Sequence, residues 1–207
     1  MTPQTASRIL RFTESIIRDM TRIANQYQAI NLSQGFPDFD PPGELIQAAV
    51  GALRSGHNRY GLTWGTQRFR EALAQKAGRF MNLPINPDTE ITVTCGSTEA
   101  MLASLMAVVN PGESVIIFSP VYENYFPGTV LAGADPVYVP LYPPEYTFDP
   151  RELRGAFKKT DAKALILCNP SNPTGKVFTL EELSLIAELA YAHDAFVITD
   201  EVYEHIV

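Results

Sequence analysis

The sequence predicts an α/β fold in which a largely parallel sheet is covered by helices on both faces. From residue 91 onward, short apolar runs alternate with stretches of helical periodicity, which is typical of strand–helix–strand units with right-handed crossovers. Polar residues stand directly after several of these runs, at the strand ends where open α/β sheets bind ligands. Neither an internal repeat nor a low-complexity segment interrupts the alternation.

Length and composition restrict the class of protein. A chain of 207 residues can bury a substantial core, and 45% hydrophobic with 19% charged residues is ordinary for a soluble globular protein. The net charge of −7 gives no support for nucleic-acid binding. No apolar stretch approaches the roughly 20 residues that span a bilayer, and the N-terminus lacks the features of a signal peptide. Because the two cysteines imply no disulfide framework, we expect a cytoplasmic protein that binds neither nucleic acid nor membrane.

The N-terminal part of the chain reads as helices separated by two irregular stretches. Helical spacing of apolar residues predicts helices over residues 7–27, 43–55 and 66–81. Gly35 lies in a proline-rich extended stretch, where a glycine favours close approach of the backbone to a ligand or is simply required by a turn. Tyr60 lies in an aromatic loop over residues 57–65, where an aromatic side chain is often a plain surface or interface anchor.

A candidate anion site follows a β-branched run. Residues 91–94 predict a strand, and a helical pattern over 101–109 follows after Gly96, Ser97 and Thr98. The amides and the positive dipole end of a first helical turn attract anions, so this order of elements predicts a phosphate-type site. Ser97 and Thr98 could instead be plain N-caps of the helix.

The next elements alternate as the fold class requires. Apolar runs predict strands over residues 114–118 and 137–139, with a helical segment between them that ends near residue 132. Tyr122 and Tyr125 follow the first of these strands, and Tyr125 is interpreted as a packing residue. After a loop over residues 142–146, a helix is predicted to start at Asp149, with Pro150 in its first turn.

The most informative stretch covers residues 164–203. It predicts, in order, a strand, a shaped loop, a capped helix and a second strand, at residues 164–167, 169–175, 179–190 and 196–198. Asn172, Asp200 and Tyr203 present an amide, a carboxylate and a phenol just past the strand ends. Each of them alone is also consistent with a turn or a helix cap.

The combination resembles the pyridoxal-phosphate-dependent aminotransferases of fold type I, class I/II. The resemblance is carried by the loop N-P-S-N-P-T-G followed by D-E-V-Y at this distance, and it extends over essentially the whole chain. The stretch N-L-S-Q-G-F-P-D-F at residues 31–39 is similar to the kynurenine/glutamine and methionine aminotransferase branch.

The resemblance implies pyridoxal 5′-phosphate as the cofactor and a role for each candidate residue. Asp200 matches the carboxylate that keeps the pyridine nitrogen protonated. Asn172 and Tyr203 match the residues that hydrogen-bond the phenolic oxygen of the ring, and Tyr122 matches the aromatic residue that stacks on the ring.

The remaining implied contacts concern the phosphate and the substrate. The resemblance places the phosphate at Gly96, Ser97 and Thr98. Tyr60 matches a tyrosine that reaches across a homodimer interface to the phosphate of the partner subunit. Gly35 and Asn172 are implied substrate contacts, and no metal ligand is expected.

The resemblance also implies an incomplete fold-type-I large domain together with part of a small domain. Residues 1–40 correspond to an N-terminal part of the small domain, and residues 41–207 to the large, cofactor-binding domain. The family's Schiff-base lysine and carboxylate-binding arginine lie further along than Val207. No lysine of this chain lies in the family's lysine motif, and Lys176 is interpreted as a surface charge. We therefore expect the isolated polypeptide to be inactive and prone to aggregate.

The implied function of the complete protein is transfer of an amino group from a neutral or aromatic L-amino acid to a 2-oxo acid, in a homodimer with shared active sites. Two alternatives remain from the sequence. The same cofactor site could support a C–S lyase or cyclopropane-forming reaction, or the chain could be a catalytically inactive cofactor-domain fragment.

Overall fold

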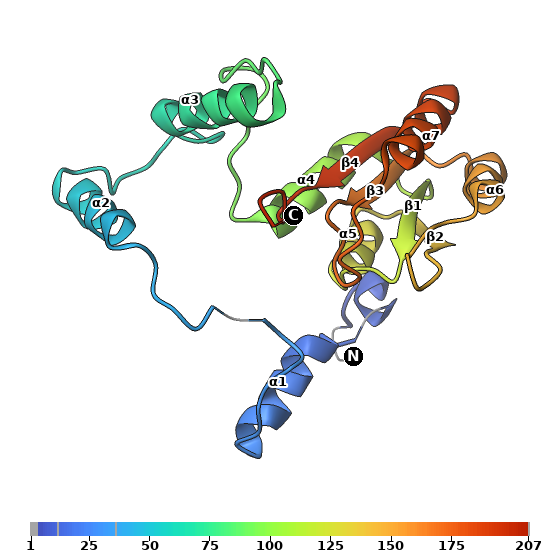
Figure 1. The fold of residues 1–207 in the computed structure, drawn as a ribbon, viewed down its shortest axis with the longest axis horizontal. Helices are drawn as coiled ribbons and strands as arrows, with labels where there is room; N and C mark the ends of the chain where they lie inside the picture. The colour runs from blue at the N-terminus through green and yellow to red at the C-terminus, as the bar shows by residue number, and fades with distance from the viewer. Residues whose placement is uncertain (1–3, 12, 36, 207) are drawn as a thin grey trace. The chain divides into compact units, whose positions relative to one another are not determined.

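The computed structural model describes residues 4–11, 13–35 and 37–206. Its contacts divide the chain into two compact units, one formed by Met1–Thr13 with Cys95–Val207 and the other by Glu14–Thr94 (Figure 1). The first unit carries the sheet, and the second is helical in its regular elements. The boundary expected at residue 40 concerns the domains of the resembled family and stays a prediction.

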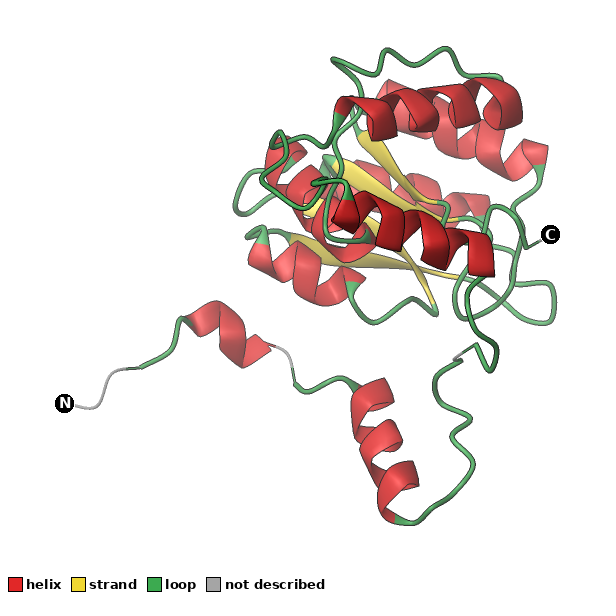
Figure 2. Cartoon of the chain, turned by 90° about the vertical axis from the view of Figure 1, so that its left-hand side faces the viewer, coloured by secondary structure: helices red, strands yellow, loops and turns green. Residues whose placement is uncertain are grey.

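The first unit is built on a four-stranded sheet in which all neighbouring strands pair in parallel. The strands are β1 (Ser114–Ser119), β2 (Asp135–Pro140), β3 (Ala164–Cys168) and β4 (Phe196–Asp200). They lie in the order β2-β1-β3-β4, and Figure 2 draws them in yellow among red helices. The strands predicted from residue 114 onward, and their parallel arrangement, are therefore confirmed.

Helices cover both faces of this sheet, namely α4 (Ser97–Val108), α5 (Tyr125–Leu131), α6 (Pro150–Thr160) and α7 (Leu180–Ala192). Successive side chains of a strand point to opposite faces. Ile116 of β1 accordingly packs in a core cluster with Phe157 of α6 and Ile186 of α7, whereas Ile117 packs in a second cluster with Leu105 of α4. These side chains are fully buried, and burial of each contributes about 1.5–3 kcal/mol. The two clusters hold the strand ends in fixed positions.

Helices α6 and α7 begin at the residues that their capping signals predicted. The Glu182 N–H donates to Thr179 Oγ1 at 3.3 Å, and the Thr179 N–H donates to the Glu182 carboxylate at 2.9 Å, which completes a capping box. Asp149 caps α6 by accepting a hydrogen bond from the Arg151 N–H at 2.8 Å, with Pro150 in the first turn. Because each cap satisfies a helix-end donor, its loss costs about 1 kcal/mol.

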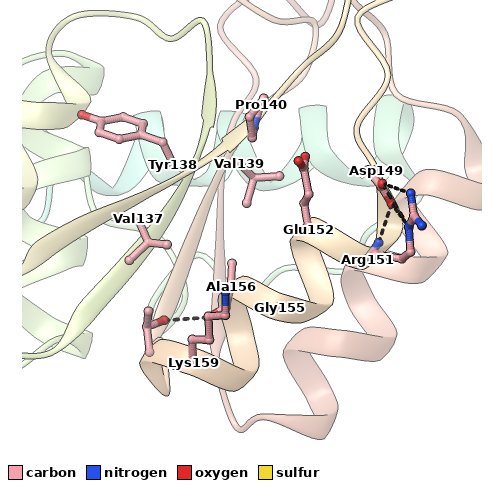
Figure 3. A pocket seen from close by; sticks show the side chains of 11 residues that line it. Val137, Tyr138, Val139, Pro140, Asp149, Arg151, Glu152, Gly155, Ala156 and Lys159 are labelled. Atoms are coloured by element: carbon pink, nitrogen blue, oxygen red, sulfur yellow. Dashed lines mark hydrogen bonds and ion pairs between the residues drawn. The ribbon is translucent and has the colours of Figure 1, made fainter.

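Two prolines reduce the number of hydrogen-bond donors on the outer edge of β2. The N–H groups of Asp135 and Leu141 donate toward the β1 side at 2.9 and 2.7 Å, so the even-numbered positions between them face the free edge. Pro136 and Pro140 occupy two of these positions and carry no N–H, which discourages pairing with a further strand. A groove of about 600 Å³ lies between β2 and α6 (Figure 3), and none of the predicted site residues lines it.

The single helix predicted over residues 7–27 is wrong. The structure has a 3-10 helix and a separate α-helix there, η1 (Ser7–Arg11) and α1 (Ile16–Gln26). Ser15 is the N-cap of α1, and its side chain accepts a hydrogen bond from the Arg18 N–H at 3.2 Å. An N-cap residue has a non-helical backbone, so the apolar spacing overestimated the helix by running across it.

The second unit contains α1, α2 (Gly43–Arg54) and α3 (Gln67–Lys76), and α3 continues into the π-helical turn η2 (Ala77–Met81). The helices predicted over residues 43–55 and 66–81 are thus confirmed. Arg70 of α3 is only 3% exposed. Its guanidinium donates to the carbonyl of Gly65 at 3.2 Å, to the carbonyl of Pro87 and to the carboxylate of Asp88 at 3.1 Å. This side chain therefore ties the loop that ends at Gly65 to the segment before residue 91.

The strand predicted over residues 91–94 does not form. The Val93 N–H donates instead to the carbonyl of Trp64 at 3.1 Å, and the segment pairs with no strand among the described residues. A β-branched composition favours a pleated, half-buried environment but does not supply the neighbouring strand that a ladder needs.

Candidate functional site

The candidate site lies where the strand order changes direction. The chain leaves β1 toward β2 on one side, whereas β3 and β4 lie on the other side of β1. The segments after β1 and β3 therefore diverge at the carboxyl ends of these strands, the place where doubly wound sheets bind ligands. A narrow hollow of about 10 Å³ is lined from both segments, by Pro120 and Tyr125 on one side and by Cys168 and Asn172 on the other.

The first turn of α4 has the features of an anion site. Gly96 is the N-cap with a φ of 85°, a conformation that residues with a side chain rarely adopt, and a Cβ there would meet open space. Ser97 and Thr98 are the first two helical residues, so the alternative in which their side chains are N-caps is wrong. Both are exposed. The turn thus offers first-turn amides, two hydroxyls and the positive end of the helix dipole to an anion.

Asp200, the last residue of β4, is held by a buried tyrosine. The Tyr125 hydroxyl donates to Asp200 Oδ2 at 2.7 Å, and the Val202 N–H donates to Asp200 Oδ1 at 3.2 Å. Burial raises the pKa of Tyr125 far above its usual value, and hydrogen bonds to the Cys168 thiol and to Asp200 raise it further. Tyr125 therefore stays protonated, and its hydroxyl donates a hydrogen bond that orients the half-buried carboxylate of Asp200.

Asn172 and Tyr203 meet between the loop after β3 and the turn after β4. Asn172 Nδ2 donates to the Tyr203 hydroxyl at 3.2 Å, and the Asn172 backbone N–H donates to Cys168 Sγ at 3.4 Å. Cys168 and Asp200 are register partners in the two strands, so the register brings both sequence motifs to one place. The three predicted residues lie at or just after these strand ends and are therefore neighbours in the fold: Asn172, Asp200 and Tyr203.

Tyr122 joins the first turn of α4 to Tyr125. Its ring packs edge-on against the Tyr125 ring, with the centroids 5.6 Å apart. Its hydroxyl accepts a hydrogen bond from Asn124 Nδ2 at 2.9 Å, and the same amide lies 3.4 Å from Thr98 Oγ1. These contacts complete one continuous set, which we call the site network: Gly96, Ser97, Thr98, Tyr122, Asn124, Tyr125, Cys168, Asn172, Asp200 and Tyr203.

Sequence reasoning did not identify three members of the site network. Tyr125 packs in the core as expected, but its hydroxyl also holds Asp200, so interpretation as packing alone is wrong. A buried tyrosine generally needs a hydrogen-bond partner for its hydroxyl, and this rule could have indicated that Tyr125 holds a polar residue. Asn124 and Cys168 carried no signal of their own, because their contacts reach residues that are distant in the chain or across a loop.

Gly35 and Tyr60 belong to the second unit, and their roles stay predictions. Tyr60 is fully exposed in its loop. Gly65, at the end of this loop, has a φ of 102°, and a Cβ there would collide with the side chain of Val93, so only glycine fits. Gly35 is exposed, with open space where a Cβ would lie.

The fold is a doubly wound α/β domain, and the candidate site lies at the switch point of its strand order. The features of this site suit a flat ligand that carries a phosphate and a basic ring nitrogen. They are a helix turn of the type that binds anions, an aromatic ring, an oriented carboxylate and an amide–phenol pair. Within the described part of the chain, no His, Cys, Asp and Glu side chains gather as metal ligands would. No helix of that part is long and apolar enough to cross a membrane.

The chain belongs to the aminotransferase class I and II family, whose family model matches residues 27–207. A probable N-succinyldiaminopimelate aminotransferase of Mycobacterium tuberculosis is 40% identical over 205 residues, which cover 98% of this chain and 51% of that protein. Methionine aminotransferase of Escherichia coli is 38% identical over 200 residues, which cover 97% of this chain and 52% of that protein.

A solved structure leads to the same family. N-succinyldiaminopimelate aminotransferase from Mycobacterium tuberculosis matches with a TM-score of 0.91 at 41% identity, over 98% of this chain and 53% of that one. The expected fold type I is thereby confirmed. The chain spans about half the length of the curated relatives it matches.

Pyridoxal 5′-phosphate is the cofactor of this family, and the site network fits it. The turn at Gly96 supplies donors for a phosphate and leaves open space beside it. With the cofactor bound, Asp200 would offer an oriented carboxylate to the ring nitrogen, and Asn172 and Tyr203 would offer hydrogen-bonding groups to a ring oxygen. The cofactor expectation is therefore consistent with both the family and the geometry.

Proposed function

We propose that the protein containing this chain is an aminotransferase that moves the amino group of an L-amino acid to a 2-oxo acid by means of pyridoxal 5′-phosphate. The observation that carries the proposal is the site network, which gathers a carboxylate, an amide, a phenol and an anion-type turn at one sheet edge in a class I and II chain. The relatives are named aminotransferases, so neither an elimination reaction nor an inactive cofactor domain is favoured.

Each side chain of the network has a distinct task in this proposal. Pyridoxal 5′-phosphate, when bound, withdraws electrons from the substrate α-carbon. Asp200 holds a proton on the ring nitrogen, because a carboxylate in a sheltered site favours the charged form of its partner. Tyr125 keeps that carboxylate oriented, while Asn172 and Tyr203 donate to the phenolic oxygen of the ring.

The remaining residues hold the ends and the face of the cofactor. Gly96, Ser97 and Thr98 bind the phosphate through the first turn of α4. Tyr122 stacks on the ring, a contact that contributes about 0.5–1.5 kcal/mol beyond burial and sets the plane of the ring.

The proposal extends to assembly, location and substrate. The protein acts as a cytoplasmic homodimer in which Tyr60 of each subunit reaches the phosphate of the partner, and its exposed position is compatible with that role. Gly35 and Asn172 border the substrate. A neutral or aromatic L-amino acid is the proposed amino donor, and the similarity to a methionine aminotransferase supports this class.

The test uses Asp200→Asn in the complete protein. Asparagine keeps an acceptor for the Tyr125 hydroxyl but removes the charge, so the fold and phosphate binding should survive. Loss of the protonated ring nitrogen should raise the barrier of substrate deprotonation by several kcal/mol, measured in a single turnover. Unchanged single-turnover deprotonation would show that Asp200 has another role.

Product analysis separates the reaction classes. Oxo-acid formation from the amino donor, matched by amination of the 2-oxo acid, is the expected result. Release of ammonia and pyruvate from a cysteine conjugate without amino transfer would contradict the proposal.

A further inference from the structure

A buried lysine lies beside the site network and has no task in the mechanism above. Lys176 is 9% exposed, so its interpretation as a surface charge is wrong. Its ammonium lies 2.9 Å from Glu182 Oε2 and 5.0 Å from the centroid of the Phe178 ring. Burial of a charge is unfavourable unless the charge is paired, and Glu182 supplies this pairing for Lys176.

The counter-charge of Lys176 belongs to a rigid element. Glu182 is the third residue of α7. Its Oε2 atom, which pairs with the Lys176 ammonium, also accepts the hydrogen bond from the Thr179 N–H of the capping box at 2.9 Å. Its side chain is 16% exposed, so solvent weakens the pair little. One carboxylate therefore joins the start of α7 to the end of the loop after β3.

The backbone of Lys176 in turn holds the residues around Asn172. The Ser171 N–H donates to the Lys176 carbonyl at 2.8 Å, and the Gly175 N–H donates to the Ser171 carbonyl at 2.8 Å. Ser171 is itself buried. Asn172 thus lies between two anchors, Cys168 on its strand side and the Lys176 turn on its helix side.

We propose that Lys176 is a positioning residue, whose ammonium, clamped by Glu182 and Phe178, fixes the turn over residues 171–176 and so holds the Asn172 amide against Tyr203. Lys176 acts on the Asn172 side chain indirectly, through the backbone of the turn, and not by direct contact with Asn172 or Tyr203. The role of Asn172 as a cofactor contact rests on the proposed function. The coupling between Lys176 and the position of Asn172 does not.

The experiment must separate positioning from plain stability. Lys176→Met keeps the length of the side chain and removes its charge, and Glu182→Gln keeps an acceptor for the Thr179 N–H. The double variant removes both charges together, and replacement of a buried ion pair by uncharged groups of similar shape is often neutral for stability. Arg154→Met is the matched control, because it removes an exposed pair with Glu188 of α7 at 3.6 Å.

The first readout needs no cofactor. In the double variant, we expect about tenfold faster hydrogen exchange at the Ser171 and Gly175 amides, since the turn opens more often, with unchanged exchange in α7. The NMR resonances of the Asn172 side-chain amide should move as well, and Arg154→Met should change neither quantity. Wild-type exchange and wild-type resonances in the double variant would overturn the proposal. Uniformly faster exchange across β3 and α7 would also overturn it, by assigning Lys176 to stability alone.

The second readout uses the complete protein with pyridoxal 5′-phosphate. The pH at which the absorbance of the bound cofactor changes should shift in the double variant and stay unchanged in Arg154→Met. An unshifted transition, in a protein that binds the cofactor, would overturn the link from Lys176 to the site. If the wild-type protein bound no cofactor, the proposed function would fail, and hydrogen exchange would still decide the role of Lys176.

Discussion

Tyr125 donates a hydrogen bond of 2.7 Å to Asp200, although 75 positions separate the two residues in the chain. Tyr125 starts α5, and Asp200 ends β4, on the other side of the point where the strand order changes. The tyrosine is 3% exposed, so its hydroxyl depends on this acceptor and on the neighbouring Cys168 thiol. A carboxylate at a strand end is thereby held by a donor that no local sequence pattern connects to it.

Tyr125→Phe should destabilise the protein by about 1–3 kcal/mol, because the variant removes the charge-assisted hydrogen bond to Asp200 Oδ2, while the Val202 N–H still donates to Oδ1. The free energy of unfolding in urea measures this loss. Tyr191→Phe is the control, since Tyr191 is 92% exposed on α7 and its hydroxyl can bond to water. Equal unfolding free energies for the two variants would show that the bond to Asp200 contributes nothing.

The same tyrosine predicts a dependence of stability on alkaline pH. The folded protein raises the pKa of Tyr125 above the value of 10.0 that an unperturbed tyrosine has. Its contribution to stability is therefore fully present below about pH 10 and decreases as the pH rises further, because only the unfolded chain releases the proton. The unfolding free energy of the wild type should fall more steeply above this pH than that of Tyr125→Phe.

Absorbance of tyrosinate checks the titration directly. Tyr125→Phe should leave the alkaline titration of the folded protein unchanged, because Tyr125 stays protonated while the protein is folded. A reduced amplitude in Tyr125→Phe before unfolding would mean that Tyr125 ionises in the folded state.

Arg70→Met should destabilise the second unit by about 1–3 kcal/mol in total, because it leaves two partly buried carbonyls without their donor. The affected carbonyls belong to Gly65 and Pro87. Trp64, the one tryptophan of the sequence, lies next to Gly65, so its fluorescence during urea unfolding reports on this loop. Arg68→Met is the control, because Arg68 is exposed on the same helix. A variant no less stable than Arg68→Met would contradict the organising role of Arg70.

Tyr60→Phe tests the shared active site of the proposed homodimer. If Tyr60 binds the phosphate of the partner subunit, the variant should retain pyridoxal 5′-phosphate less well while it dimerises normally. Equilibrium dialysis and analytical ultracentrifugation measure these two properties. Normal cofactor retention would remove Tyr60 from the site.

Mixed dimers show in which subunit Tyr60 acts. One subunit carries Tyr60→Phe and the other carries Asp200→Asn. If Tyr60 acts across the interface, both defects fall in one site and the other site stays intact, so about half of the wild-type activity should remain. Activity well below half would place Tyr60 in the site of its own subunit.

The sequence alone determined the features that depend on residues near one another in the chain. The capping box of Thr179 and Glu182 requires only three-residue spacing, and the strands from β1 to β4 require only apolar runs of the right length. The positions of Asn172 after β3 and of Asp200 at the end of β4 follow from the same runs, which is why the motif could be read before any contact was known.

The tertiary structure alone decided burial, register and hydrogen-bond partners. Residues 91–94 have the composition of a strand, yet Val93 bonds to Trp64, because composition does not supply a neighbouring strand. Lys176 is charged and follows a glycine in a loop, yet Glu182 and Phe178 pack around it. Periodicity and capping act over a few residues, whereas partners across a sheet are set by packing between distant segments, and that packing determined which tyrosine holds Asp200.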